Sequence, residues 1–172
     1  VGHSMGGAVA LEAARLMPDR VIGIVGADAF QDIGATGSAA NREFGDQLIA
    51  HLRVDYIGAT REFVTKQLFA KDADPALARR VADDMALAPP EVAIPSLRAL
   101  FDYDYGSVLA GLHVPIVDIE TDLYGPADPE RIHRLAPAFR VQVMAGRGHF
   151  LMMEDPAGFD ARLREHITAF MK

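Results

Sequence analysis

Apolar residues gather in three short runs that predict strands. These runs are residues 21–27 (VIGIVGA), 114–120 (VPIVDIE) and 141–146 (VQVMAG). The first holds only apolar residues and glycine, and a strand that is apolar on both faces is typical of a parallel sheet covered by helices. The pattern therefore predicts an α/β protein with a buried, mostly parallel sheet.

Helical patterns alternate with these runs. Residues 7–17 are rich in Ala and Leu and end at Pro18, and residues 129–139 (PERIHRLAPAF) are mostly helical in pattern. A last helix is predicted after Asp155, a suitable N-cap, with Pro156 at its first position. Its expected buried stripe consists of Phe159, Leu163, Ile167 and Phe170.

The middle of the chain, residues 31–110, shows no comparable strand. Apolar residues recur there at helical spacing, Asp74 and Pro75 predict a helix start, and Pro89, Pro90 and Pro95 predict breaks. We therefore expect two regions. Residues 1–30 and 111–172 form an α/β core, and residues 31–110 form an inserted helical cap or lid.

Composition narrows the function classes. The chain has 172 residues and a net charge of −7 without a basic run, which argues against a nucleic-acid or anionic-membrane surface. It contains no cysteine, so disulfides and thiolate metal sites are excluded. No apolar run is long enough for a membrane span. We expect a soluble, cytoplasmic protein, and the sequence leaves its oligomeric state open.

The first residues carry a motif of nucleophilic catalysis. Gly2 to Gly6 spell G-x-S-x-G, with Ser4 at the centre and a predicted helix directly after it. A sharp turn between strand and helix exposes the serine oxygen, and small flanking residues let the backbones approach. The helix start places the Met5 N–H where an oxyanion would form, so Met5 is the expected oxyanion-hole donor.

A serine nucleophile needs a base, and His149 is the best candidate among six histidines. It follows a predicted strand in a loop (AGRGHFLMMEDP), whereas His51, His133 and His166 fall within helical patterns and His3 belongs to the motif itself. No two histidines have the i, i+4 spacing of a helical metal site, so neither a metal nor another cofactor is expected.

The chain resembles the α/β-hydrolase family over nearly its whole length. The resemblance rests on GHSMGG, VIGIVGADAF, VPIVDIETD and the closing GRGHF and EDP, and on a helical insert in the place of a cap domain. It implies a Ser-His-acid triad in the order serine, acid, histidine. Serine at position 4 disfavours the dehalogenases and epoxide hydrolases of the family, which have Asp there. The resemblance also implies that the sheet's earlier strands should precede Val1, so we expect the chain to be the C-terminal part of a longer hydrolase.

The resemblance offers two places for the acid. The acid usually follows the penultimate strand, where Asp122 lies close to the expected position and Asp128 lies further along the loop. The other known place is the end of the strand after the nucleophile helix, where Asp28 stands. Asp122 and Asp28 are equally good candidates, and Asp128 is a weaker one. Glu154 and Asp155 are expected to cap the last helix.

These expectations favour a serine hydrolase that cleaves a carboxylic ester or a similar acyl substrate through an acyl-enzyme. The apolar residues of the insert suggest a small hydrophobic substrate. Two alternatives remain at this point: a hydrolase-like module that binds a ligand without turnover, and an inactive fragment of a longer hydrolase. The sequence does not identify the substrate.

Overall fold

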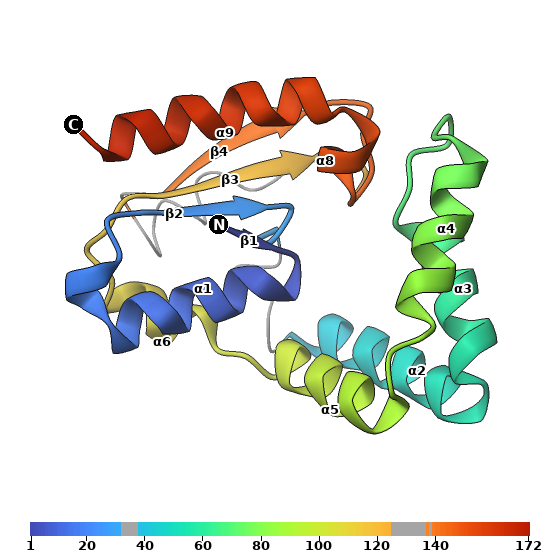
Figure 1. The fold of residues 1–172 in the computed structure, drawn as a ribbon. Coiled ribbons are helices and arrows are strands. Elements are labelled where there is room, and N and C mark those ends of the chain that lie inside the picture. Colours follow the sequence, from blue (N-terminus) through green and yellow to red (C-terminus); the bar gives the residue numbers. More distant parts are fainter. Residues whose placement is uncertain (32–37, 125–136, 138) are drawn as a thin grey trace. The chain divides into compact units, whose positions relative to one another are not determined.

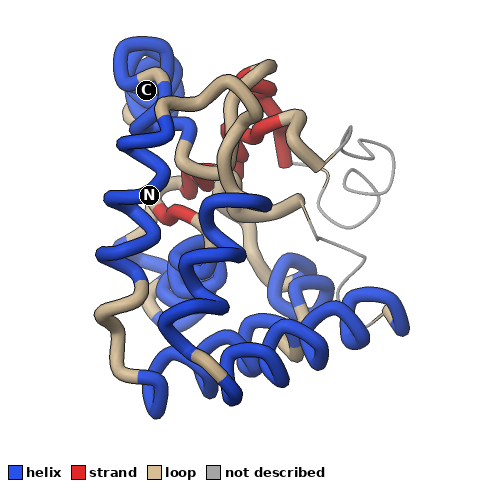
Figure 2. Tube along the Cα trace, turned by 90° about the vertical axis from the view of Figure 1, so that its right-hand side faces the viewer, coloured by secondary structure: helices blue, strands red, loops and turns tan. Residues whose placement is uncertain are grey.

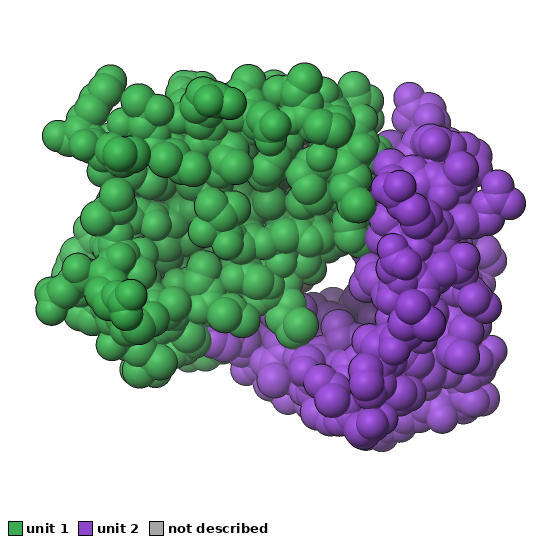
Figure 3. All heavy atoms as spheres, viewed as in Figure 1, with its two compact units in different colours: residues 1–34, 104–172 green, residues 35–103 purple. Residues whose placement is uncertain are grey.

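The computed structural model describes residues 1–31, 38–124, 137 and 139–172. The chain divides into two compact units, each described by itself below (Figure 3). The first unit contains residues 1–34 and 104–172, and the second contains residues 35–103. The sheet and the loops that follow its strands all belong to the first unit.

In its described residues, the first unit is built on a parallel sheet of four strands. They are β1 (Gly2–His3), β2 (Ile24–Ala27), β3 (Ile116–Thr121) and β4 (Phe139–Met144), and they lie side by side in that order (Figure 1). Ile24 of β2 pairs with Ile116 of β3, and Ile116 pairs with Phe139 of β4. Strands β2 and β3 are buried at every position, as the apolar runs predict. The α/β fold with a parallel sheet is thereby confirmed.

Helices cover both faces of this sheet. On one face, α9 (Pro156–Phe170) and the short α8 (Leu151–Glu154) pack through a core of Val25, Ala27, Ile119, Met144, Leu151 and Phe159. On the other face, α1 (Met5–Leu16) and α6 (Tyr105–Ala110) pack against each other, and the Phe30 ring contacts the rings of Tyr105 and Phe139. A short 3-10 helix, η1 (Pro18–Arg20), follows α1. Figure 1 shows α9 and α1 on opposite sides of the strands.

The described part of the second unit consists of four helices and their connections (Figure 2). They are α2 (Ala39–Val54), α3 (Tyr56–Gln67), α4 (Pro75–Met85) and α5 (Pro90–Phe101). Helix α2 packs against α3 and α5, and α3 packs against α4. Ion pairs between Arg98 and Asp46 (2.6 Å) and between Arg61 and Asp83 (2.7 Å) join neighbouring helices at the surface.

Several boundaries differ from the sequence predictions. Strand β2 begins only at Ile24, because pairing with β3 begins there, and Ile22 is exposed. Pro95 lies inside α5 instead of breaking it. Helix α6 belongs to the first unit, so that unit resumes at residue 104 and not at 111.

Two further predictions concern the C-terminal region. Ile167 is exposed, because the packed stripe of α9 consists of Phe159, Leu163 and Phe170 only. Phe139 is not the end of a helix but the first residue of β4. The rest of the segment predicted to be helical, apart from residue 137, lies outside the described residues. Among the described residues, no helix is both long and apolar enough to cross a membrane.

Candidate active site

The functional candidates gather where the parallel strands end. Ser4 directly follows β1, Asp28 directly follows β2, and His149 lies in the loop between β4 and α8. All four strands run in the same direction, so their carboxyl ends meet at one edge of the sheet. Open parallel sheets bind their ligands at this edge. The topology therefore brings together residues that are far apart in the sequence.

Ser4 occupies a sharp turn between β1 and α1. Its backbone has φ 52° and ψ −125°, an uncommon conformation for any residue other than glycine. The Ser4 N–H donates to the Ala27 carbonyl (3.2 Å), and the Ser4 carbonyl accepts from the Gly7 N–H (2.8 Å). These bonds tie the turn to β2 on one side and to the helix on the other. Met5 is the first residue of α1, so its N–H lies in the first turn, where helical N–H groups lack intrahelical partners.

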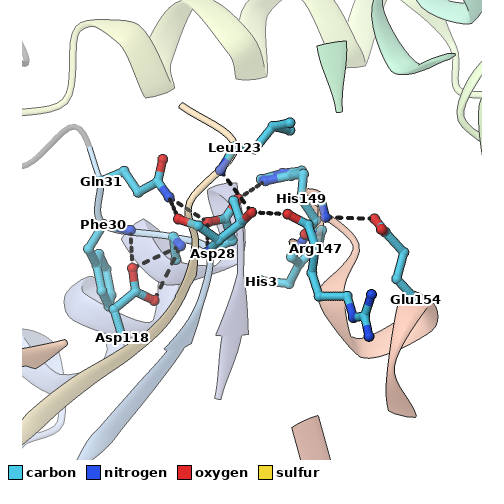
Figure 4. A network of polar contacts seen from close by, with 12 residues as sticks. His3, Asp28, Phe30, Gln31, Asp118, Leu123, Arg147, His149 and Glu154 are labelled. Carbon is cyan, nitrogen blue, oxygen red and sulfur yellow. Dashed lines mark hydrogen bonds and ion pairs between the residues drawn. The ribbon is translucent and has the colours of Figure 1, made fainter. Parts of the chain in front are cut away.

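His149 is hydrogen-bonded to Asp28. Its Nδ1 lies 2.5 Å from Asp28 Oδ2, and the two side chains are 13% and 1% exposed (Figure 4). A carboxylate can only accept, so Nδ1 carries the proton and Nε2 remains the basic nitrogen of the ring. A buried carboxylate that orients an imidazole in this way is the arrangement that a serine nucleophile requires of its base.

Asp28 is fixed by several further contacts. Its Oδ1 accepts from the Thr121 N–H (3.0 Å) and from Gln31 Nε2 (2.9 Å), and its own N–H donates to the Ile119 carbonyl (2.8 Å). Its φ is 49°. Ser4 and Asp28 are the only residues other than glycine with positive φ in the described ranges. Uncommon backbone conformations concentrate at functional sites because the surrounding structure must hold them.

His3 connects the Ser4 turn to the His149 loop. Its Nε2–H donates to the His149 carbonyl (3.0 Å), and the two rings lie 4.6 Å apart. Burial and the neighbouring His149 lower the pKa of His3 to about 4. His3 is therefore neutral near pH 7. The motif pattern alone predicts no contact between His3 and His149.

Two carboxyl groups lie deeper in β3. Asp118 and Glu120 are buried on the same face of the strand, and Asp118 Oδ2 accepts the N–H groups of Phe30 (2.8 Å) and Ala29 (3.2 Å). Burial raises the pKa of both carboxyl groups, and their mutual repulsion adds to the rise for Glu120. The apolar pattern of VPIVDIE predicts only a strand, although two acids within an apolar run indicate buried polar groups.

The other predicted residues occupy different places. Asp122 is exposed, and its Oδ1 accepts from the Gly146 N–H (2.8 Å), so its contact is with the turn after β4. Asp155 caps α9 as predicted, accepting from Gly158 N (3.0 Å). Glu154 instead accepts from Gly148 N (3.0 Å), one residue before His149. Asp128 lies outside the described residues. No cluster of metal-binding side chains occurs in the part of the chain that the structure describes.

The profile of the alpha/beta hydrolase family matches residues 1–162 of this chain. The chain belongs to the alpha/beta hydrolase family. Residues 4 and 28 directly follow strands β1 and β2 of this fold, and residue 149 lies in the loop after β4. No curated protein matches the chain.

Solved structures agree with this fold. A thermophilic esterase from Thermogutta terrifontis is 24% identical with a TM-score of 0.79, over 99% of this chain and 64% of its own. An enol-lactonase from Burkholderia xenovorans is 19% identical with a TM-score of 0.80, over 97% of this chain and 64% of its own. A hydrolase from Oleispira antarctica is 21% identical with a TM-score of 0.80, over 96% of this chain and 63% of its own. The hydrolase chain described here thus spans less than two thirds of the length of each.

Proposed function

We propose that this hydrolase cleaves a carboxylic ester or a similar acyl substrate through Ser4, His149 and Asp28. The observation that carries the proposal is the hydrogen bond between His149 Nδ1 and Asp28 Oδ2 at the sheet edge where Ser4 stands in a strained turn. The esterase and lactonase among the similar structures support this class of substrate.

In this mechanism, Ser4 Oγ attacks the carbonyl carbon of the substrate while His149 Nε2 takes its proton. The negative charge on the carbonyl oxygen is stabilised by the Met5 N–H at the start of α1. His149 then donates the proton to the leaving alcohol. Water attacks the acyl-enzyme with His149 again acting as base, which releases the acid and restores Ser4. Asp28 orients His149 and stabilises its charged form.

We propose Asp28 as the acid in preference to Asp122. Asp28 is buried and contacts His149, whereas Asp122 is exposed and contacts the Gly146 N–H. A matched pair of variants distinguishes them. Asp28→Asn should lower kcat by about four powers of ten, because the imidazole loses its orienting carboxylate, while Asp122→Asn should lower it little. The reverse result, measured with a short-chain aryl ester, would make Asp122 the acid.

The nucleophile is tested with Ser4→Ala in the full-length protein. Ester hydrolysis should fall by several powers of ten, with KM and the melting temperature nearly unchanged. A fluorophosphonate probe should label the wild type at Ser4 and leave the variant unlabelled. If the wild type bound ester analogues but neither hydrolysed esters nor reacted with the probe, the protein would be a ligand-binding module instead of an enzyme.

A further inference from the structure

Asp118 is a fully buried carboxyl group that the proposed mechanism does not use. It lies in the middle of β3, a strand buried at every position. Burying a carboxylate is costly unless hydrogen bonds compensate for the lost water. The hydrogen-bond partners of Asp118 therefore indicate which part of the structure this buried carboxyl group stabilises.

These partners are the two residues that follow Asp28. The N–H groups of Ala29 and Phe30 both donate to the Asp118 carboxylate, at 3.2 and 2.8 Å. Asp28 itself stands at φ 49°, so the chain turns sharply just where these bonds begin. In the view of Figure 4, Asp28 lies between Asp118 and His149. The carboxylate thus holds the backbone on the side of Asp28 opposite to the imidazole.

Gly26 provides the space for this arrangement. It pairs with Asp118 across the sheet, and a Cβ at position 26 would lie 2.2 Å from Asp118 Oδ1 and 2.6 Å from the Phe30 ring. Any side chain there would displace the carboxylate from the turn. The strand that carries Asp28 therefore lacks a side chain at the position where the carboxylate lies.

Glu120 supplies a proton to the same network. Its side chain is hydrogen-bonded to that of Asp118, and burial raises the pKa of both groups. The Phe30 and Ala29 N–H groups counteract this rise for Asp118. Burial thus raises the pKa of Glu120 further, to about 9, than that of Asp118, to about 7, so the first proton of the pair is held on Glu120 and the Asp118 oxygens accept from the turn.

We propose that Asp118 is a positioning residue, which holds the Ala29–Phe30 backbone so that Asp28 Oδ2 meets His149 Nδ1. Its effect on the reaction rests on the proposed function. Its effect on the Asp28–His149 contact does not, and this contact can be observed without a substrate.

The first measurement is the proton NMR resonance of the His149 Nδ1–H in the full-length protein, assigned by its loss in His149→Gln. Asp118→Asn keeps the size of the side chain but removes its charge. The Ala29 and Phe30 N–H groups both donate to Oδ2, so the neutral amide oxygen in that place accepts both bonds more weakly. We expect the resonance to move upfield or to disappear through exchange with water, because the Nδ1–H bond to Asp28 lengthens.

The second measurement is steady-state kinetics with an aryl ester. Asp118→Asn should lower kcat by about tenfold, because two charge-assisted hydrogen bonds become neutral ones of about half the strength, with KM changed less than about twofold. The control is Asp104→Asn. Asp104 also accepts a backbone N–H, from Ser107, but this bond caps α6 and does not involve residues 28–30. Asp104→Asn should lower the melting temperature without moving the His149 resonance or changing kcat.

The outcomes separate the two proposals. If the wild type hydrolyses no ester but Asp118→Asn moves the resonance, the positioning role stands and the proposed function fails. An unmoved resonance in folded Asp118→Asn overturns the positioning role, and so does an unchanged kcat in an active enzyme. An equal movement in Asp104→Asn overturns it too, because the effect would then follow from lost stability alone. If a larger change such as Asp118→Leu fails to fold, the isosteric variant Asp118→Asn still tests the proposal.

Discussion

The two glycines of the G-x-S-x-G motif are sterically different in this structure, and this difference predicts opposite effects of the same substitution. A Cβ added at Gly2 would lie 2.2 Å from the Gly6 carbonyl oxygen, 2.4 Å from its carbon and 2.7 Å from the Gly7 nitrogen. A Cβ added at Gly6 would meet nothing within 4 Å. The overlap at Gly2 is with backbone, so the start of α1 itself has to move.

The size of this movement sets the expected loss. Real Cβ contacts essentially never fall below 3.0 Å, so Gly2→Ala displaces the first turn of α1 by about 0.8 Å. Ser4 lies between the two colliding segments, and a misplacement of about 1 Å can cost about 100-fold in rate. We therefore expect kcat/KM to fall by about 10- to 100-fold, with about 1–3 kcal/mol lost from the free energy of unfolding through overpacking.

Gly6→Ala is the matched control, because it adds the same methyl group to the same turn. Alanine favours a helix over glycine by up to about 1 kcal/mol, which corresponds to about 2–4 °C in Tm for a chain of this size. Both variants are compared by aryl-ester hydrolysis and by thermal melts followed by circular dichroism. Equal activity in Gly2→Ala and Gly6→Ala would refute the steric argument, since only one of them creates an overlap.

Three further predictions concern stability. Burial lowers the pKa of His3 from 6.5 to about 4. Between these pH values the unfolded chain binds a proton at His3 and the folded chain does not. His3→Gln should therefore flatten the loss of Tm between pH 6.5 and 4, and an unchanged slope would exclude this group as its source. Burial raises the pKa of the Glu120 carboxyl group, so its contribution to the free energy of unfolding is present at acid pH and is lost as the pH rises above the pKa that Glu120 has in the unfolded chain. Glu120→Gln should therefore raise Tm relative to the wild type at pH 8–9 and not at pH 4. Ile119→Ala should cost about 2–5 kcal/mol in urea unfolding, because Ile119 is fully buried in the core under α9, and a loss below 1 kcal/mol would contradict that packing.

The hydrophobic pattern predicts the strands well but not their ends. Residues 21–23 are as apolar as residues 24–27, yet only the latter pair with β3. Hydrogen bonding between strands decides where a strand begins, and a single strand's sequence carries no information on its partner's register. Phe139 illustrates the same limit, since an apolar residue next to a helical pattern fits a helix end as well as the first pair of a ladder.

The sequence predicts some residues of the candidate site and not others. Ser4 and His149 could be named from the sequence because each belongs to a local pattern with a known geometry. The choice between Asp28 and Asp122 depends on which carboxylate faces the imidazole, and the sequence places both at strand ends. The contacts of Asp118, Thr121 and Gln31 with the segment of residues 28–30 are long-range or loop-dependent, so no spacing rule predicts them.

The β1–α1–β2 segment has a consequence for how this hydrolase can diversify. Ser4 directly follows β1 and Asp28 directly follows β2, so helix α1 and strand β2 lie between them. Residues 35–103 come later in the chain than both. With Asp28 as the acid, the helical unit is not inserted between nucleophile and acid. The segment that joins them, residues 4–28, has only 25 residues, and a change in the length of the helical unit does not alter it. Loop insertions are thermodynamically cheap when they leave the flanking elements intact. Exchange of the helical unit between relatives would then leave the Ser4–Ala27 bond between the two strand ends unchanged.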